Sequence, residues 1–301
     1  MSIRMLRTLI AVEEHKTFSA AAGAVYLTHA AVSQQMRTLE AEWGVTLFDR
    51  SKRVPKLNAL GREVVVKARE VVRAYDAIIP SSLGSTGLSG EVSLGTVPTT
   101  LTGLAPLAAT VLKERLPDLH VHVHPALTIP LLAQLERGIL DAAIVTRPAA
   151  LPAGIAFADL AEEPLQLLAS SDAESNDPFE LLANYPFIRF SREAVVGNLV
   201  EAWLQKHGIR VKEAMELENL EAISSMVFAN LGVSIVPRSC VQSFNPLPIK
   251  RLSLGDDGPT RTLSLIYQEN SPRMRVIEEL LNAVREAIRI GILDPAYKVT
   301  K

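Results

Sequence analysis

The sequence predicts a multi-domain α/β protein with a small helical domain first, one long helix next and a larger α/β domain last. Three observations lead to this fold class. Short helices and a hairpin signal fill the first sixty residues, a heptad repeat of apolar residues follows, and strands then alternate with helices. A chain of 301 residues is long for one average domain, so it allows this division.

The composition is that of a soluble protein, with 48% hydrophobic and 21% charged residues and no apolar stretch of membrane-spanning length. The N-terminal residues lack the small-residue cleavage site of a secretory signal. Cys240 is the single cysteine, which excludes an intramolecular disulfide, and we expect a cytoplasmic protein. Residues 1–90 hold 12 Lys/Arg against 8 Asp/Glu, a mild basic excess that permits nucleic-acid binding without establishing it.

Three helices are predicted in the first part of the chain. An amphipathic helix begins near Leu6 and ends near His15, and a second, short helix begins with Ser19 as its N-cap. Thr28 is the predicted N-cap of the third helix. The apolar positions of that helix lie three or four residues apart, as one buried face requires: Val32, Met36, Leu39 and Trp43.

The opposite face of the third helix carries small or hydrogen-bonding side chains and no carboxylate. It consists of His29, Ala30, Ser33, Gln34 and Arg37. Gln and Arg can form bidentate hydrogen bonds with base edges, and Ala can approach a thymine methyl, so this face suits the DNA major groove. The alternative is an ordinary surface helix, because a polar face is common in bundles.

A basic hairpin is predicted after this helix. Residues 45–48 and 54–57 have the pattern of two short strands, and the segment between them contains Arg50, Lys52 and Arg53. These charges suit DNA phosphates, and contacts of that kind fix the register of a protein on DNA without reading its sequence. We therefore expect Arg37→Ala to relax base preference and Arg50→Ala to weaken binding to all DNA.

The runs FSAAA at 18–22, LTHAAVSQQMRTLE at 27–40, GVTLFDR at 44–50 and LNALG at 57–61 together resemble the LysR-type transcriptional regulators. The resemblance is gapless over about sixty residues. It implies a winged helix-turn-helix in residues 1–58, and His29 and Ala30 differ from the family's usual residues. The DNA-binding residues are then predicted to be Ser19, Thr28, His29, Ala30, Ser33, Gln34, Arg37, Arg50, Lys52 and Arg53.

A linker helix over residues 59–80 carries an apolar heptad seam formed by Gly61, Val64, Ala68, Val71, Tyr75 and Ile78. A 3.5-residue period favours helix pairing and hence a homodimer, although the seam could also pack on its own domain. The resemblance implies dimers through this helix, assembly to a homotetramer, and RNA polymerase as a candidate partner. Residues 81–90 are rich in Ser and Gly and predict a hinge.

Residues 91–301 alternate between strands and helices, which predicts parallel or mixed sheets covered on both faces. The expected helices include one that begins at Pro98 to Thr100 and one that is capped by Thr128. The resemblance implies an effector-binding domain of two α/β subdomains like those of periplasmic binding proteins. Subdomain I would contain 91–162 and 268–301, and subdomain II would contain 163–267.

The predicted effector site lies where strands end and helices begin, since helix N-termini direct N–H groups and positive charge to that edge. Hydroxyls and a guanidinium there suit a small polar or anionic molecule, although capping alone also explains Thr99 and Thr128. The resemblance aligns three of the threonines with effector contacts and places residues 196–198 opposite. The predicted set is Thr99, Thr100, Thr128, Thr146, Arg147, Val196 and Asn198.

Other chemistry has less support. His120, His122 and His124 share one face of a strand, but no carboxylate or Cys accompanies them, so an outward face is favoured over a metal site. Cys240 is predicted at a helix start, where a dipole would lower its pKa, although a packed thiol is the simpler interpretation. No catalytic or cofactor motif appears and no cofactor is expected. The competing hypothesis is a metabolic binding protein or enzyme whose N-terminal helices only dimerise.

Overall fold

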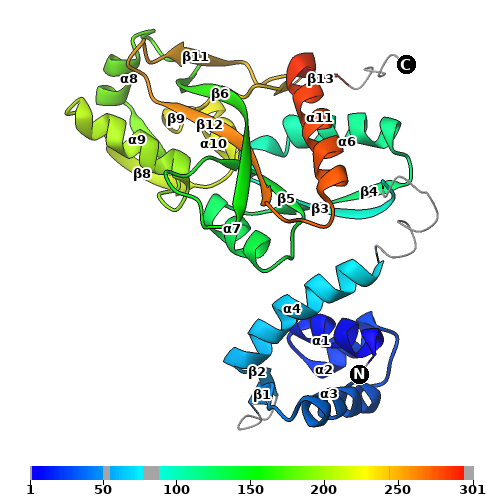
Figure 1. Ribbon diagram of the computed structural model, residues 1–301. Coiled ribbons are helices and arrows are strands. Elements are labelled where there is room, and N and C mark those ends of the chain that lie inside the picture. Colours follow the sequence, from blue (N-terminus) through cyan, green and yellow to red (C-terminus); the bar gives the residue numbers. More distant parts are fainter. Residues whose placement is uncertain (1, 50–54, 77–87, 244, 295–301) are drawn as a thin grey trace. The chain divides into compact units, whose positions relative to one another are not determined.

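The computed structural model describes residues 2–49, 55–76, 88–243 and 245–294 (Figure 1). The chain folds as two compact units, one before residue 88 and one formed by most of the residues that follow. The predicted hinge lies outside the described residues except for 88–90, as do Ile78 and the basic residues Arg50, Lys52 and Arg53. Among the described helices, none combines the length and the apolar character needed to cross a bilayer.

The first unit is a helical domain with a small hairpin, as the sequence predicts. Its described elements are α1 (Ile3–His15), α2 (Phe18–Ala24), α3 (His29–Trp43), β1 (Phe48–Asp49), β2 (Lys56–Leu57) and α4 (Ala59–Asp76). The predicted apolar face of α3 is confirmed for Val32, Met36 and Leu39, which are fully buried, but not for Trp43 at the end of the helix, which is 37% exposed. β1 and β2 pair antiparallel but are shorter than predicted.

The predicted heptad seam on α4 divides into two parts. Gly61 and Ala68 are buried within the first unit, where Ala68 belongs to the core formed with α1, whereas Val71 and Tyr75 are 48% and 51% exposed. An added Cβ at Gly61 would meet the Leu47 carbonyl group, so this position is already in close contact with its own domain. The first half of the seam is therefore used inside the unit, and of the described seam residues Val71 and Tyr75 are the ones left exposed for another chain.

The second unit is built on one mixed seven-stranded sheet. Its order is β11-β6-β12-β5-β3-β4, with β9 paired to β6. The strands are β3 (Gly90–Thr96), β4 (Leu119–Pro125), β5 (Ala142–Thr146), β6 (Ile155–Ser170), β9 (Ser234–Pro237), β11 (Ile249–Ser253) and β12 (Thr260–Gln268). β3 pairs parallel with β4 and β5, and β12 pairs antiparallel with β5 and β6.

Helices and four shorter strands surround this sheet. They are the 3-10 helix η1 (Pro98–Thr100), α6 (Leu104–Arg115), α7 (Thr128–Glu136), α8 (Pro178–Asn184), α9 (Val195–Lys206), α10 (Leu220–Phe228), α11 (Met274–Ile290), β7 (Pro186–Phe190), β8 (Lys212–Leu217), β10 (Gln242–Ser243) and β13 (Ile292–Leu293). The helix predicted to begin at Pro98 to Thr100 is instead the short η1, and α6 starts separately after it.

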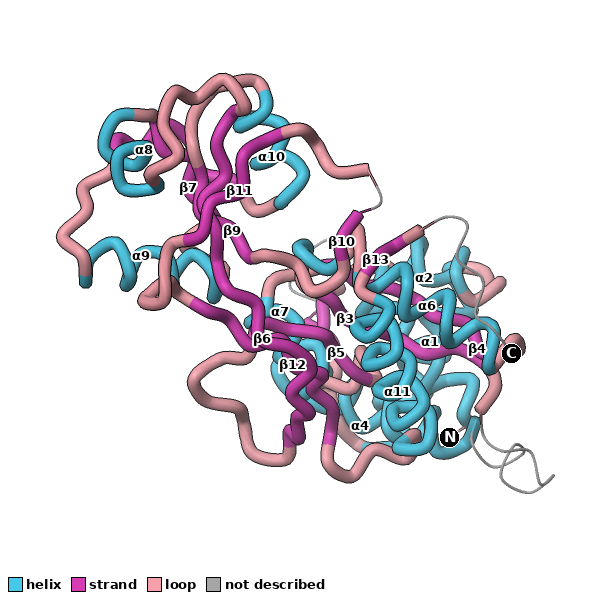
Figure 2. The backbone as a smooth tube through the Cα atoms, turned by 90° about the horizontal axis from the view of Figure 1, so that it is seen from above, coloured by secondary structure: helices cyan, strands magenta, loops and turns pink. Residues whose placement is uncertain are grey.

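Two hydrophobic cores lie on either side of the middle of β6. One gathers side chains of β3, β5, β12 and α11, and the other gathers side chains of residues 165–254. Figure 2 shows β6 as one continuous strand that passes from one half of the unit to the other. The chain returns earlier than predicted, because Leu263 and Leu265 of β12 lie in the first core and not in the second. The return point is therefore near Pro259 to Arg261 and not near Tyr267.

Gly197 fixes the packing of α9, which forms one wall of the cleft described below. A Cβ there would collide with the backbone carbonyl of Ser191 and approach that of Phe190 to 2.9 Å. We expect Gly197→Ala to lower the free energy of unfolding by about 1–3 kcal/mol, because overpacking against backbone forces α9 to shift. Urea unfolding followed by circular dichroism measures this.

The matched control is Gly23→Ala in α2, where an added Cβ meets nothing within 4 Å. There the higher helix propensity of alanine should stabilise the first unit by about 0.5–1 kcal/mol. If Gly197→Ala raises the free energy of unfolding as much as Gly23→Ala does, α9 can move without cost.

Candidate functional site

The polar face of α3 is open to solvent along its first two turns. Thr28, His29, Ala30, Gln34 and Arg37 are exposed, and Ser33 is half-buried beside them. The Thr28 side chain accepts a hydrogen bond of 3.2 Å from the Ala31 N–H, which confirms its predicted role as the N-cap. The structure thus brings six of the predicted DNA-binding residues onto one accessible surface.

The predicted cap of α2 is wrong by two residues. Thr17 caps this helix by accepting a hydrogen bond of 3.1 Å from the Ala20 N–H, and Ser19 is an exposed residue inside the helix. Thr17 was the better candidate, because Phe18 begins the buried face of α2. Ser19 remains on the surface of the helix-turn-helix.

Two side chains that the sequence analysis did not single out hold the α3 region in place. The Glu40 carboxylate accepts hydrogen bonds from the Leu47 and Phe48 N–H groups at 2.8 and 3.1 Å, which ties the hairpin to α3. Arg69 of α4 forms ion pairs with Glu13 and Glu14 of α1, at 3.2 and 2.7 Å. Burial raises the pKa of Glu13, but Lys16 and Arg69 outweigh it and hold the pKa below its usual range.

In the second unit, a cavity of about 830 Å³ opens where α9 faces β5, β6 and β12. Three predicted effector contacts line it, namely Thr146, Arg147 and Asn198. A much narrower space of about 10 Å³ adjoins it and is lined by Thr99, Thr128, Thr146 and Val196. That volume is close to the size of a single water, so of these two spaces the larger one has room for a small molecule. We call the larger cavity the cleft.

Thr100 does not line either space. Its buried hydroxyl is hydrogen-bonded to the Thr96 hydroxyl and to the Val97 carbonyl, so its role is structural and its predicted place in the effector site is wrong. Thr128 opens α7, and its hydroxyl donates a hydrogen bond of 3.3 Å to the Thr146 carbonyl. The hydroxyl of Thr128 therefore links two of the predicted positions.

A buried ion pair that the sequence analysis missed forms the floor of the cleft. Arg261 of β12 lies against Glu163 of β6, with Nε and Nη2 at 2.8 and 2.6 Å from the same carboxylate oxygen. Both side chains are at most 2% exposed. Arg261 Nη1 also donates hydrogen bonds to the Thr99 and Thr146 hydroxyls at 2.8 and 3.2 Å. A hydroxyl that accepts from a guanidinium keeps its own O–H to donate, so Arg261 orients both threonines as donors.

Arg147, predicted as the guanidinium of the effector site, lines the cleft together with an acidic partner. Its guanidinium is paired with the Asp159 carboxylate and lies 4.4 Å from the centre of the Phe157 ring. A hydrogen bond from Ser264, and then the interaction with Arg147, hold the pKa of Asp159 below its usual range. The cleft therefore presents Arg147 together with its carboxylate partner.

Comparisons with known proteins agree with this geometry. Residues 3–62 match the family of bacterial regulatory helix-turn-helix proteins of the lysR type, and residues 85–289 match the LysR substrate binding domain. The chain belongs to the LysR family. It is thus a DNA-binding transcriptional regulator with a C-terminal substrate-binding domain, and the predicted winged helix-turn-helix and two-subdomain fold are confirmed.

Similar LysR-type regulators include the hydrogen peroxide-inducible genes activator of Haemophilus influenzae, which is 30% identical over 98% of this chain and 99% of the relative. The DNA-binding transcriptional dual regulator OxyR of Escherichia coli is also 30% identical, over 95% of each chain. Among solved structures, a full-length OxyR variant of Pseudomonas aeruginosa superposes with a TM-score of 0.76 at 26% identity, over 95% of each chain. The DNA complex of CbnR matches in fold, with a TM-score of 0.65 at 21% identity and coverage of 95% of this chain and all of the other.

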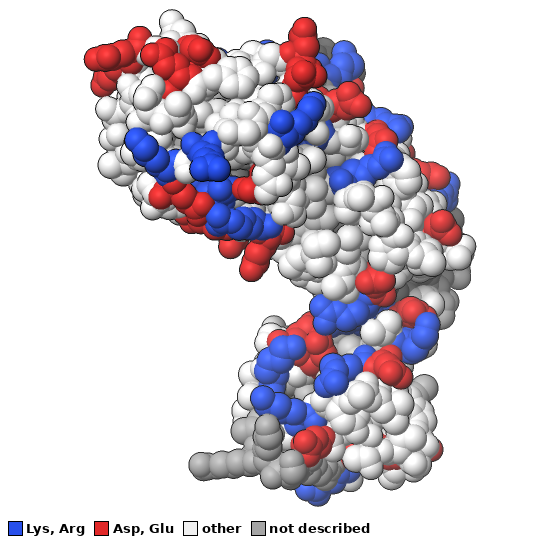
Figure 3. Space-filling model, turned by 90° about the vertical axis from the view of Figure 1, so that its left-hand side faces the viewer, with Lys and Arg blue, Asp and Glu red and all other residues white. Residues whose placement is uncertain are grey.

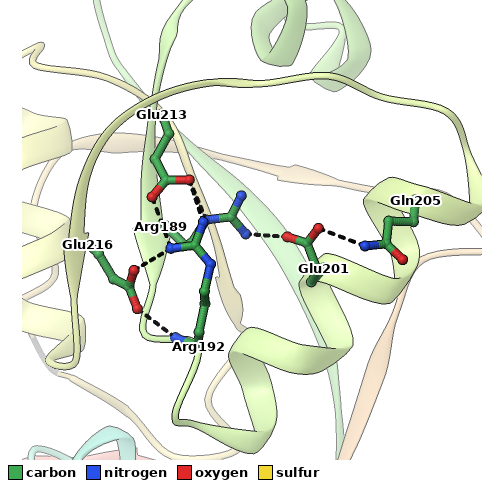
Figure 4. A network of polar contacts seen from close by, with 6 residues as sticks. All are labelled: Arg189, Arg192, Glu201, Gln205, Glu213 and Glu216. Atoms are coloured by element: carbon green, nitrogen blue, oxygen red, sulfur yellow. Dashed lines mark hydrogen bonds and ion pairs between the residues drawn. The ribbon is translucent and has the colours of Figure 1, made fainter.

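An ion-pair network fixes the α9 wall of the LysR-type effector domain (Figure 4). Arg189 of β7 donates hydrogen bonds of 2.5 Å to Glu201 of α9 and 2.9 Å to Glu213 of β8. Arg192 donates to Glu213 at 2.7 and 3.0 Å and also pairs with Glu216. The network joins three elements, so it holds the helix that carries Asn198.

This network predicts a loss of stability in acid. Hydrogen bonds from Arg192 and then Arg189 hold the pKa of Glu213 below its usual range. A carboxyl group whose pKa is lower in the folded chain stabilises it above the ordinary pKa, and the contribution is lost as pH falls through the folded pKa. We expect the melting temperature of the second unit to fall between about pH 5 and about pH 3. Glu213→Gln should make this fall smaller, and thermal melts at each pH measure it.

If the melting temperature of Glu213→Gln falls with pH as much as that of the wild type, Glu213 does not have this role. The control is Glu114→Gln, because Glu114 is exposed.

The histidine row and the cysteine are not part of the cleft. His120 and His122 are exposed on β4, and among the described residues no cluster of His, Cys, Asp or Glu could hold a metal ion. Cys240 lies in a bend after β9 and not at a helix start, so the predicted helix dipole is absent. Burial and the neighbouring Glu163 raise the pKa of its thiol to about 12.

Proposed function

We propose that the exposed face of α3 is the DNA recognition surface and that Arg37 and Gln34 on it contact bases. The observation that supports this is the solvent-open polar face on a helix whose other side buries Val32, Met36 and Leu39. Arg37 has no ion-pair partner among the described residues, so its guanidinium is available to a guanine edge. His29, Ala30 and the half-buried Ser33 would complete the surface, with Ser19 and Thr28 near the phosphates.

We also propose that a small polar effector binds in the cleft, in contact with Thr146, Arg147 and Asn198. The cleft has the size of typical small-molecule sites, and its floor carries donors that Arg261 holds in place. An effector that binds one arrangement of the two halves more tightly shifts the population toward it. That shift would reach DNA through a homodimer or homotetramer, to which Val71 and Tyr75 contribute an exposed apolar surface.

The chain acts in this proposal by binding and not by catalysis, and it acts in the cytoplasm. Gel-shift titration of the full chain against the intergenic region beside its own gene tests it. We expect binding that weakens steeply as salt increases, because phosphate contacts release counterions. The absence of a shift at low salt with folded protein would overturn DNA recognition and favour a metabolic binding protein or enzyme.

Several relatives are named for induction by hydrogen peroxide, but we propose that this chain does not respond through Cys240. The cysteine is single, so no disulfide can form within the chain. A pKa near 12 leaves about a thousandfold less thiolate at neutral pH than an ordinary thiol has, and thiolate is the species that reacts.

We therefore expect millimolar peroxide to leave DNA affinity unchanged and alkylation of Cys240 in the folded chain to be at least about 100-fold slower than that of a free thiol. Mass spectrometry after timed alkylation measures the rate. A peroxide-induced change in DNA binding that disappears in Cys240→Ser would contradict this expectation, and the unfolded chain provides the reference rate.

A further inference from the structure

We propose that Tyr26, in the turn between α2 and α3, binds the DNA backbone through a hydrogen bond from its hydroxyl to a phosphate oxygen. This inference rests on the proposed function, because it concerns the surface on which α3 begins. It adds a DNA contact that belongs neither to the polar face of α3 nor to the predicted basic segment. The contact is also of a different chemical kind, because its donor is uncharged.

The turn that contains Tyr26 has the hydrogen bonds of a Schellman motif, which commonly ends a helix. The Leu27 N–H donates to the Ala22 carbonyl at 2.9 Å, and the Tyr26 N–H donates to the Gly23 carbonyl at 3.4 Å. The motif places a left-handed backbone at Tyr26, where φ is 54°. Glycine is the usual residue at such a position, because a Cβ makes this conformation costly. A tyrosine here is therefore unfavourable for folding.

The ring of Tyr26 does not offset this cost by packing. The residue is 95% exposed, and within the described part of the chain its hydroxyl has no hydrogen-bond partner. Two other helix ends of the first unit show the usual solutions. Gly44 is the left-handed residue after α3, and Lys16, left-handed after α1, forms an ion pair with Glu13 at 3.2 Å. A strained residue that makes no such contact points to a role outside its own domain.

The place of Tyr26 in the helix-turn-helix indicates what it meets. The N-terminal residues of a recognition helix enter the major groove, and Tyr26 lies two residues before Thr28, the N-cap of α3. Because α3 itself fills the groove, a side chain that precedes its first turn lies at the edge of the groove, where the sugar-phosphate backbone runs. Phosphate oxygens accept hydrogen bonds, and tyrosine hydroxyls are among their common donors in proteins.

An uncharged contact has a signature that separates it from the basic ones. On the face of the first unit drawn in Figure 3, Lys and Arg intermingle with Asp and Glu, without a large area of one sign. A contact from Arg50 would release a counterion and add to the salt dependence of binding. A tyrosine hydroxyl releases none. It should therefore raise the affinity for all sequences and leave the salt dependence unchanged.

Fluorescence anisotropy with the full chain and duplexes selected from a random pool tests this inference. Tyr26→Phe removes only the hydroxyl and should weaken binding about 3- to 10-fold, equally on the operator and on a scrambled duplex. The slope of log affinity against log salt should remain that of the wild type. Tyr185→Phe, which removes a hydroxyl from the second unit, is the matched control and should change neither quantity.

Tyr26→Gly keeps the test independent of damage to the fold. It removes the ring and relieves the left-handed backbone, so it should weaken DNA binding at least as much as Tyr26→Phe. In the same variant, the protection of the α2 and α3 amides against hydrogen exchange should increase about 2- to 5-fold. A loss of binding together with a gain in stability cannot come from a disrupted helix-turn-helix.

Wild-type affinity of Tyr26→Phe would overturn the hydrogen bond, and a larger loss on the operator than on the scrambled duplex would overturn the phosphate as its acceptor. A change in the sedimentation of either Tyr26 variant without DNA would assign the ring to a contact between copies of the chain instead. Arg37→Ala in the same assay distinguishes the two proposals. If it weakens operator binding while the Tyr26 variants do not, the recognition surface stands without Tyr26, and if none of them has an effect, the proposed surface itself is wrong.

Discussion

Replacing Arg261 with methionine is expected to lower the free energy of unfolding of the second unit by about 3–5 kcal/mol. The substitution leaves the Glu163 carboxylate, which is 2% exposed, without its cation in the interior. It also removes the donors that hold the Thr99 and Thr146 hydroxyls. Urea unfolding followed by the fluorescence of Trp203 measures the loss, and Trp43→Phe removes the signal of the first unit.

The double variant Arg261→Met with Glu163→Leu separates the charge from the packing. A buried ion pair replaced by apolar residues of similar volume is often neutral for stability, so the double variant should regain most of what the single variant loses. A single variant as stable as the wild type would show that water reaches Glu163. A double variant as unstable as the single one would show that packing and not charge determines the loss.

Arg37→Ala is expected to reduce the discrimination between the operator and a scrambled duplex by about 1–3 kcal/mol, or roughly 5- to 150-fold. Its side chain is exposed on α3, where a bidentate contact with guanine can form. Arg37→Lys keeps the charge but loses the planar fork, so it should restore general affinity without restoring discrimination. Fluorescence anisotropy with duplexes selected from a random pool measures both quantities.

Equal weakening on operator and scrambled DNA would show that Arg37 contacts phosphate and not a base. Arg50→Ala, in the predicted basic segment outside the described residues, is the comparison, since a phosphate contact should weaken all sequences alike and reduce the salt dependence. The two variants together thus distinguish base recognition from backbone contact.

The first unit could be predicted well because its signals are local. Thr28 lies directly before the apolar repeat of α3, and the distance between a cap and the helix it begins is fixed by backbone geometry. The heptad seam was harder, because periodicity shows that a face is apolar but not what covers it. Gly61 and Ala68 belong to the seam by spacing, yet α1 and the hairpin of the same chain already cover them.

The cleft was predicted only in part because its floor joins residues far apart in the chain. Arg261 and Glu163 are 98 positions apart and meet only when β6 and β12 pair. A signal was present, since each is a charged residue at the edge of an apolar strand, where an unpaired charge would be costly. Thr100 shows the opposite error, because its position near a strand end matched the expected pattern while its side chain turned into the core.

The continuity of β6 also limits how the cleft can open. A strand of 16 residues spans about 50 Å, and β12 is hydrogen-bonded only along its first ten residues, so relative motion of the two halves is expected to concentrate near residues 164 and 165, where that pairing ends. We expect the motion to be a rotation of one half against the other about this short segment. A twist of about 10° at the cleft becomes a displacement of roughly 4 Å at a point 25 Å from the axis. Binding of a small molecule in the cleft would then displace residues at the far end of the unit that do not contact the ligand.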